Sequence, residues 1–430
     1  MNSSYYNIPV ELGSEILLFN SISKSFVIFY KDRFKEIYRK GEFITERLSP
    51  KESSDLYKNG FLSENDNETE RNLWLAIRNK RRLNTKSYLM IVNPTLDCNL
   101  RCWYCYENHK KGSRFTATLI DAILENLEMQ FKINSFSDFT LSLFGGEPLL
   151  ATNEVISLID RVSEFCNNKN IKLHLFFTTN GTLVNSRLIH AIHDFECSFQ
   201  VTLDGDQKIH DTIRVFKANP GLGTSQIIYK NIKRLLVELP LSKVIVRLNY
   251  TGRTLNNMGG IYNFLGELDA NKVRVSLHKV WQENEGEVST ELLINHVLKI
   301  RKMGFEINVQ SLPTEDSLCY ADYLNCVVVN YNGDVFKCTA KDFTSQNKCG
   351  YLDNSGIICW DQEELGKHVF SSIPNNCQKC KYLPCCPSFC SQGCIDNNHG
   401  ICILPSGITL EDIVLYNYLI RRENHEKNSL

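Results

Sequence analysis

The stretch that decides the expected fold is Cys98-Asn99-Leu100-Arg101-Cys102-Trp103-Tyr104-Cys105. Its three cysteines have the spacing C-x3-C-x2-C and follow the β-prone run Leu89–Asn93. Three thiolates on one short loop can hold three irons of a [4Fe–4S] cube and leave the fourth iron open to another ligand. Zinc, with His109 as a fourth ligand, is the alternative, although structural zinc sites usually pair two CxxC knuckles.

Around this loop, strand and helix patterns alternate. Alternation of this kind indicates βαβ units with a parallel sheet. Six units are too few for a closed eight-fold barrel, so we expect an α/β fold, a curved partial (β/α)6 barrel with its ligand at the carboxyl ends of the strands. The predicted strands are Leu89–Asn93, Phe139–Phe144, Lys172–Thr178, Ser198–Leu203, Val244–Tyr250 and Val273–His278, and the helices include Ala117–Phe131, Glu154–Asn167, Ser186–Asp194, Ser225–Leu239 and Glu291–Lys302.

Composition narrows the class of protein. The 430 residues carry 48 basic and 49 acidic side chains, so a nucleic-acid or membrane-surface role, which needs clustered positive charge, is not expected. There are 17 cysteines, but the N-terminus lacks a signal-peptide pattern and no apolar run is long enough to span a membrane. We therefore expect a cytoplasmic protein whose cysteines serve metal or redox chemistry.

The cysteine trio resembles the CxxxCxφC signature of the radical S-adenosylmethionine (SAM) enzymes, with the aromatic Tyr104 before the last cysteine. The resemblance implies that Cys98, Cys102 and Cys105 hold a [4Fe–4S] cluster whose open iron binds SAM. In that family, an electron from the cluster cleaves SAM and yields a 5′-deoxyadenosyl radical that abstracts a substrate hydrogen.

Further motifs fall where this family would place its SAM contacts. Gly145-Gly146-Glu147-Pro148 ends the second strand and resembles the GGEP motif that receives the SAM amino group, since paired glycines allow close backbone approach. Thr179-Asn180-Gly181 follows the third strand, and Asp204 ends the fourth. Arg214 is a candidate partner for the SAM carboxylate because a guanidinium can pair with it through two hydrogen bonds, and a surface ion pair is the competing interpretation. Asn249 on the fifth strand is a further candidate.

The C-terminal cysteines resemble a SPASM domain, which holds two auxiliary [4Fe–4S] clusters, making three clusters in total. The matching cysteines are Cys319, Cys326, Cys338, Cys377, Cys380, Cys386, Cys390 and Cys402. The resemblance implies Cys319, Cys338 and Cys390, with Cys326, for the first cluster, and Cys377, Cys380, Cys386 and Cys402 for the second. Cys385 and Cys394 leave the assignment ambiguous, and a pair of structural zinc knuckles is the alternative for this block.

The first 90 residues predict a small α+β unit. Glu15–Asn20 and Ser25–Tyr30 form an expected hairpin, helices follow at Asp32–Lys40 and Ser49–Asn59, and a polar wing follows at Ser63–Asn67. This arrangement is winged-helix-like, and an exposed strand edge there can capture the leader of a precursor peptide as an added strand. A stabilising cap is the alternative. The expected domains are a leader-binding domain at 1–88, the radical SAM barrel at 89–310 and the SPASM domain at 311–430.

Two enzymatic functions and one non-enzymatic function follow. We expect a maturase of ribosomally made peptides (RiPPs) that installs a thioether or carbon–carbon crosslink, supplied with electrons by a flavodoxin or ferredoxin. Sulfatase maturation to formylglycine is the alternative, but those enzymes typically carry an aspartate base after the hairpin cysteine, where this chain has Thr339, with Asp342 nearby. A zinc-rich binding scaffold is the second alternative. The sequence does not identify the precursor, the modified residue, the catalytic base or the oligomeric state.

Overall fold

The computed structural model describes residues 1–282, 288–309, 318–369, 373–386, 392, 395–396 and 409–428. They belong to two compact units. One unit contains Met1–Leu83, Leu318, Cys319 and the described part of Ser371–Leu430, and the other contains the described parts of Asn84–Gln310 and Tyr320–Phe370. The two units are distinguished only by which residues pack together. The functional division into 1–88, 89–310 and 311–430 stays a prediction.

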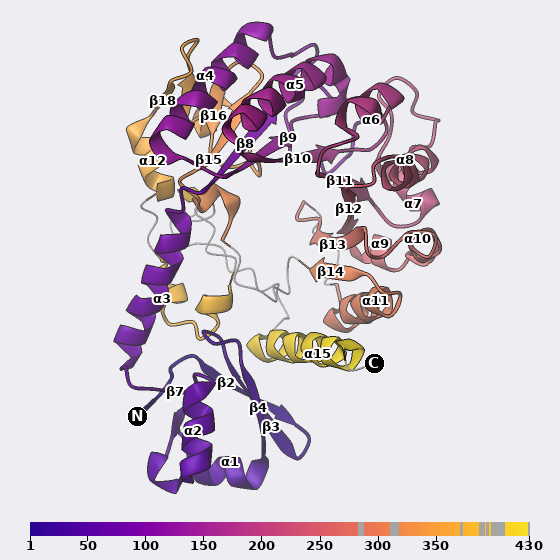
Figure 1. Ribbon diagram of the computed structural model, residues 1–430. Helices are drawn as coiled ribbons and strands as arrows, with labels where there is room; N and C mark the ends of the chain where they lie inside the picture. Colours follow the sequence, from indigo (N-terminus) through magenta and orange to yellow (C-terminus); the bar gives the residue numbers. More distant parts are fainter. Residues whose placement is uncertain are drawn as a thin grey trace. The chain divides into compact units, whose positions relative to one another are not determined.

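A long curved sheet forms the centre of the second unit, and its strands follow one another around an arc (Figure 1). Seven strands pair in parallel in chain order, which gives the α/β partial barrel that the alternation predicted. They are β8 (Ser87–Asn93), β9 (Asp138–Leu143), β10 (Lys172–Thr179), β11 (Cys197–Leu203), β12 (Ser242–Tyr250), β13 (Val273–Lys279) and β14 (Glu306–Val309).

The helices between these strands lie on the outside of the arc (Figure 1). Alternate side chains of each strand face them and are buried; Phe177 of β10 and Phe199 of β11, for example, stack with ring centroids 4.7 Å apart. The helices are α4 (Ala117–Asn134), α5 (Thr152–Lys169), α6 (Ser186–Ile192), α7 (Gln207–Ile213), α8 (Ser225–Glu238), α9 (Gly252–Leu255), α10 (Gly259–Leu265) and α11 (Thr290–Lys302). No described helix combines the length and hydropathy that crossing a bilayer requires.

The sheet extends beyond the six predicted strands at both edges. At one edge β14 pairs with β13, and at the other β15 (Cys326–Asn330) pairs in parallel with β8. Three short antiparallel strands continue from β15, namely β16 (Asp334–Phe336), β17 (Gly350–Leu352) and β18 (Ile358–Trp360), followed by α12 (Gln362–Val369). The short strands were missed because three or four residues carry too little periodicity to be recognised.

The N-terminal unit contains a three-stranded antiparallel sheet of β2 (Asn7–Leu12), β3 (Glu15–Asn20) and β4 (Phe26–Tyr30). The predicted hairpin is confirmed by the pairing of β3 with β4. The edge strand β2 was not predicted, since its Pro9 is typical of strand edges rather than of strands in general. Smaller pairs join β1 (Asn2–Ser3) to β7 (Leu62–Ser63) and β5 (Tyr38–Arg39) to β6 (Glu42–Phe43).

Helices cover one face of this sheet (Figure 1). These are α1 (Lys31–Ile37) and α2 (Pro50–Lys58), and the apolar core between sheet and helices includes Leu18, Ile37 and Phe61. A capping box between Ser49 and Glu52 starts α2 where the sequence placed a helix. A longer helix, α3 (Asn67–Arg82), ends the segment.

The other face of the N-terminal sheet is covered by the end of the chain. The C-terminal helix α15 (Leu410–Asn428) packs against β2, and Tyr418 of α15 lies with its ring centroid 5.6 Å from that of Phe26. The segment that holds α13 (Asn375–Gln378) also contacts this sheet, since Ser21 Oγ donates a hydrogen bond to the Lys381 carbonyl at 2.5 Å. The N-terminal sheet is therefore completed by residues almost 400 positions away.

Candidate active site at the carboxyl ends of the strands

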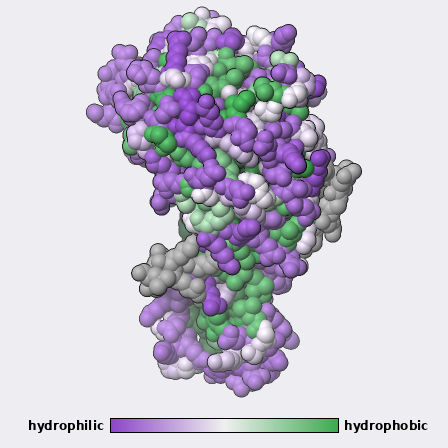
Figure 2. Space-filling model, turned by 90° about the vertical axis from the view of Figure 1, so that its right-hand side faces the viewer, coloured by the Kyte–Doolittle hydropathy of each residue, from purple (hydrophilic) through white to green (hydrophobic). Residues whose placement is uncertain are grey.

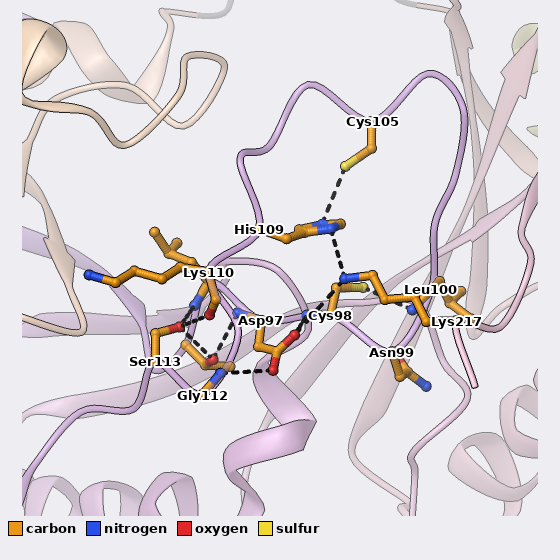
Figure 3. Close-up of polar contacts among 12 residues, drawn as sticks. Asp97, Cys98, Asn99, Leu100, Cys105, His109, Lys110, Gly112, Ser113 and Lys217 are labelled. Carbon is orange, nitrogen blue, oxygen red and sulfur yellow. Dashed lines mark hydrogen bonds and ion pairs between the residues drawn. The ribbon is translucent and has the colours of Figure 1, made fainter.

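The cysteine trio lies on the loop between β8 and α4, and that loop is held at both ends. Asp97 accepts hydrogen bonds from the backbone N–H of Cys98 (2.8 Å) and of Gly112 (3.0 Å). The next residues pair with the segment after α7, where Arg101 N donates to Val215 O at 2.9 Å. Figure 3 shows Asp97 below the loop with His109 between Cys105 and Lys217. The loop is thus preorganised by backbone contacts rather than by the cysteines alone.

The three thiols differ in exposure. Cys98 is buried, Cys102 is intermediate and Cys105 is exposed. Burial, with a smaller contribution from the nearby Glu147 carboxylate, raises the pKa of Cys98 to about 12. Burial also raises the pKa of Cys102, while the Arg214 guanidinium lowers it. Such thiols need a bound cationic group to ionise, which fits their predicted role as iron ligands.

The GGEP motif is joined directly to the cysteine loop. Gly146 N donates to Thr95 O (3.1 Å) and Glu147 N donates to Asp97 O (2.8 Å). A Cβ atom on Gly145 would lie 2.3 Å from Thr95 O, and one on Gly146 would lie 2.3 Å from Asp97 O. Only glycine allows this backbone approach, so both glycines position the loop that carries Cys98.

Glu147 and Asn180 connect three successive strand ends. The fully buried Glu147 carboxylate accepts hydrogen bonds from Thr179 Oγ1 (2.7 Å), Asn180 N (2.7 Å) and Leu149 N (3.1 Å). Asn180 Nδ2 in turn lies 2.8 Å from Asn99 Oδ1 and 3.8 Å from Cys98 Sγ. Pro148 follows as the first residue of a 3-10 turn and is buried. This network holds the second and third strand ends against the cysteine loop.

Tyr104 connects the other predicted SAM contacts. Its hydroxyl donates to Asp204 Oδ2 (2.7 Å) and accepts from Arg214 Nη1 (2.7 Å) and Asn249 Nδ2 (2.9 Å). Arg214 also forms an ion pair with Asp204 at 3.5 Å. Residues that lie up to 145 positions apart in sequence therefore meet at one phenol.

A cavity of about 150 Å³ opens in front of these groups. Its wall includes the cysteine trio, Gly145, Gly146, Asn180, Arg214 and Asn249, and also Arg247, Lys279, Trp281 and Gln282. A larger hollow of about 680 Å³ between α8 and α10 lies on the outside of the sheet, and none of the trio lines it. The smaller cavity is the one at the carboxyl ends of the strands, where ligands of such folds bind.

Unpaired polar atoms indicate that the site is shaped for a ligand. Within the described chain, Asn93 Oδ1, Asp204 Oδ1 and Arg214 Nε are buried and have no hydrogen-bond partner. Leaving such atoms unpaired costs about 1–3 kcal/mol each. Of these three residues only Arg214 lines the cavity, so a ligand with an acceptor group, such as the carboxylate of SAM, could satisfy its Nε.

Four residues of the cavity wall were not predicted from sequence: Arg247, Lys279, Trp281 and Gln282. Gln282 Nε2 donates to Tyr104 O at 2.7 Å, from a segment with no motif. Arg247 could have been predicted from one feature of the sequence. It stands two residues before the candidate Asn249 on β12, and alternate residues of a strand share a face.

His109, the predicted fourth ligand in the zinc alternative, lies near the trio. Its Nε2 is 3.6 Å from Cys105 Sγ, and nowhere in the described ranges do three His, Cys, Asp or Glu side chains gather around one ion position, which holds for a zinc site and for an iron cluster alike. The fourteen cysteines that the structure describes form no disulfide.

The predicted auxiliary ligands are only partly described. Cys326 begins β15 and is buried, Cys338 follows β16 and is buried, and Cys319 precedes a short 3-10 turn. Cys377, Cys380 and Cys386 lie in and after α13, where the ambiguous Cys385 donates a hydrogen bond to Ser21 O at 2.9 Å. Cys390, Cys394 and Cys402 lie outside the described residues. Both auxiliary ligand sets stay predictions.

Comparison with known proteins identifies one domain of the chain. The model of the radical SAM superfamily matches residues 92–265, which contain the trio, the GGEP motif and the strand ends around Tyr104. A cysteine-type anaerobic sulfatase-maturating enzyme of Clostridium perfringens is 23% identical over 335 residues, covering 70% of this chain and 88% of that enzyme.

Solved structures share the fold. The structure titled "Native anSMEcpe with bound AdoMet and Kp18Cys peptide" matches with a TM-score of 0.61 at 16% identity and covers 80% of this chain and 99% of that one. Streptococcus suis SuiB bound to precursor peptide SuiA matches with a TM-score of 0.52 at 16% identity, covering 93% of this chain and 98% of that one. The superfamily match and the similarity to sulfatase-maturating enzymes rule out the non-enzymatic scaffold. Residues 92–265 of the chain therefore form a radical SAM domain, and the chain is an enzyme similar to the anaerobic sulfatase-maturating enzymes.

Proposed function

We propose that this enzyme is a peptide maturase that installs an intrapeptide crosslink, through sulfur or carbon, in a ribosomally made precursor. The observation that carries the proposal is the N-terminal unit, with its exposed strand edge. The structural likeness to SuiB, which was solved with a precursor peptide, extends over 93% of this chain, whereas the likeness to anSMEcpe covers 80%.

The strand β4 is the proposed docking edge for the leader of the precursor. It pairs only with β3 among the described strands, and the opposite edge strand, β2, carries Pro9, which removes one backbone donor. Ile28 and Tyr30 of β4 are 41% and 72% exposed. Figure 2 shows hydrophobic side chains gathered on one face of the part of the molecule that contains this sheet. An extended peptide added to β4 would gain backbone hydrogen bonds and apolar contacts together.

In the active site, Cys98, Cys102 and Cys105 would hold the cluster, and Asn180, Asp204, Arg214 and Asn249 would hold SAM. When bound, the cluster and SAM would supply the radical that removes a hydrogen atom from the substrate. Tyr104 fixes the side chains of Asp204, Arg214 and Asn249 before any ligand arrives. The aromatic pair of Tyr106 and Trp281, with ring centroids 6.3 Å apart, stands at the cavity wall and would help to exclude water.

Three clusters, with the two auxiliary ones in the cysteine-rich end, are part of the proposal. After losing a hydrogen atom, the substrate must lose one further electron and a proton to close a new bond, and auxiliary clusters would accept that electron. A reconstituted chain should contain about 12 irons if all three clusters are cubanes, and about 4 would remove the auxiliary assignment.

Mass spectrometry tests the reaction. The enzyme is co-expressed with the peptide encoded beside its gene, and the peptide is expected to lose two hydrogen atoms per crosslink. The matched control replaces Cys98, Cys102 and Cys105 by alanine. An unchanged peptide mass with active enzyme would contradict the proposal.

Sulfatase maturation is the second candidate, and one contact favours it. Asp342 Oδ2 accepts a hydrogen bond from Asn108 Nδ2 at 2.6 Å, so a carboxylate lies beside the segment that follows the cysteine trio, although Thr339 follows Cys338. Conversion of a sulfatase peptide cysteine to formylglycine, abolished by Asp342→Asn, would support this candidate over crosslinking.

A further inference from the structure

Arg247 is a cation of the cavity wall with an incomplete set of partners. It lies on β12, is largely withdrawn from solvent and lines the cavity in front of the cysteine trio. Within the described chain, its guanidinium makes a single hydrogen bond, from Nε to Asn249 Oδ1 at 2.9 Å. The two Nη groups, which form the fork that grips carboxylates, are left for another partner.

The strands around Arg247 provide no carboxylate. Register places Thr202 of β11 and Ser276 of β13 directly beside it, and both are neutral. Along its own strand the neighbours on the same face are Ile245 and Asn249. Across the site, Asp204 Oδ2 is bound by Tyr104 and Arg214, Asp204 Oδ1 has no hydrogen-bond partner, and no ion pair joins Asp204 to Arg247 within the described chain.

The described cavity wall as a whole is positive. Arg214, Arg247 and Lys279 line it, and no aspartate or glutamate is among its lining residues. Charges withdrawn from water are normally paired, because an unpaired one costs several kcal/mol. Burial accordingly lowers the pKa of Arg247.

The two arginines stand in different relations to the cysteine trio. Arg214 Nη1 donates a hydrogen bond at 2.7 Å to the hydroxyl of Tyr104 on the cysteine loop, whereas Arg247 Nε donates to Asn249 Oδ1 of its own strand at 2.9 Å. A SAM molecule bound through its amino-acid end at the open iron would therefore place its carboxylate near Arg214. Arg247 is left for an anion of another molecule in the same cavity.

We propose that Arg247 binds a carboxylate of the peptide substrate, namely the side chain of a glutamate or aspartate next to the residue that loses hydrogen. The inference rests on the proposed peptide substrate, and it specifies that an acidic residue lies next to the residue that loses hydrogen. Arg247 is then a specificity-determining residue. It selects acidic core sequences and holds the peptide through two parallel hydrogen bonds.

Binding of defined peptides tests this role without a known precursor. The probe is a pair of synthetic libraries of equal length, with random flanking positions and a central residue that is Glu in one and Gln in the other. Cluster-loaded full chain with SAM is incubated with both libraries, and retained peptides are counted by mass spectrometry. The wild type should retain Glu peptides on the order of tenfold better than Gln peptides, since a bidentate charged pair is worth about 1.5–3 kcal/mol.

Three variants sharpen the comparison. Arg247→Gln should lose the preference, and Arg247→Lys should keep part of it because the charge remains without the fork. Arg274→Gln is the matched control. Arg274 lies on the same face of the neighbouring strand but already pairs with Glu306 at 2.8 Å, so the preference should not change.

A second arm distinguishes the substrate carboxylate from that of SAM. Dissociation constants are measured for SAM and for decarboxylated SAM. Arg214→Gln should weaken SAM binding and leave decarboxylated SAM little affected, while Arg247→Gln should change both constants by the same factor, because its bond to Asn249 concerns both ligands alike. If Arg247→Gln instead weakens only SAM, Arg247 binds the SAM carboxylate and the proposal is wrong.

One other outcome would overturn it. A wild type without Glu preference refutes it directly. Binding selectivity is independent of turnover, so failure of crosslinking with intact Glu preference would count against the proposed function alone.

Discussion

Tyr104 illustrates how one side chain can organise a site. In sequence it is the aromatic residue of the trio signature, and in the structure its hydroxyl joins Asp204, Arg214 and Asn249 from three different segments. Its own burial raises its pKa well above the usual value, so the phenol stays protonated and can donate to Asp204. Tyr104 therefore acts through the hydrogen bonds of its hydroxyl as well as through the packing of its ring.

Tyr104→Phe should weaken SAM binding by about tenfold, because removal of the hydroxyl leaves three buried polar partners less well satisfied, at about 1.4 kcal/mol or more. Equilibrium dialysis with labelled SAM measures the effect. The neighbouring Trp103 is 53% exposed, so Trp103→Phe serves as a control that should bind SAM normally. Equal affinities in both variants would contradict the organising role of the hydroxyl.

His210 predicts a pH dependence of stability. It is fully buried, its Nδ1 accepts a hydrogen bond from Asp204 N at 3.2 Å, and burial lowers its pKa from 6.5 to about 3. Between these two values the unfolded chain takes up a proton and the folded chain does not, so this contribution to stability is complete above pH 6.5 and is lost as pH falls. The loss approaches about 1.4 kcal/mol per pH unit.

Anaerobic denaturant unfolding of the full chain at pH 7.5 and pH 5.5 measures this loss. His210→Gln removes the titrating group, and its stability should fall less between the two pH values than that of the wild type. An identical fall in both proteins would show that His210 is protonated in the folded state.

At the scale of elements, the turn after β9 and the loop after β8 act as one piece, because the glycines of the GGEP motif touch backbone oxygens of the loop. Gly146→Ala should displace the loop and abolish 5′-deoxyadenosine formation while lowering the iron content by about one cluster. Gly252, where an added Cβ would meet nothing within 4 Å, provides the control Gly252→Ala. Normal iron content in Gly146→Ala would contradict this view of the motif.

In the N-terminal unit, the helix α15 is the element whose packing can be tested in the same way. Ile413 of this helix is completely buried, and α15 packs on β2. Ile413→Ala should cost about 2–5 kcal/mol and increase hydrogen exchange in β2 to β4, but not in β9 to β12 of the other unit. Leu419 on the same helix is 40% exposed, so Leu419→Ala should change little. Exchange that rises equally in both units would contradict the assignment of α15 to the N-terminal sheet.

At the scale of the whole molecule, the two compact units separate the proposed tasks. The cysteine trio belongs to the second unit and the proposed leader edge to the first. Replacement of Cys98, Cys102 and Cys105 by alanine should therefore abolish SAM cleavage and remove about four irons, yet leave the affinity for the precursor peptide unchanged. Loss of peptide binding in this variant would show that the leader depends on the radical site.

The sequence by itself determined the parts of this enzyme that depend on local pattern. The C-x3-C-x2-C spacing, the GGEP turn and the period of strands and helices are written in contiguous residues, and they predicted the partial barrel and its cluster loop. Tyr104, Asp204, Arg214 and Asn249 were found because each stands in or near a recognisable motif at a strand end.

Only the tertiary structure decided which of these side chains touch, and which residues without a motif join them. Arg247 and Gln282 enter the cavity because β12 and the segment after β13 curve around it, and parallel strands bring together residues that no sequence spacing relates. The covering of the N-terminal sheet by α15 has the same origin, since burial of an apolar face requires a partner surface but does not specify where in the chain that partner lies.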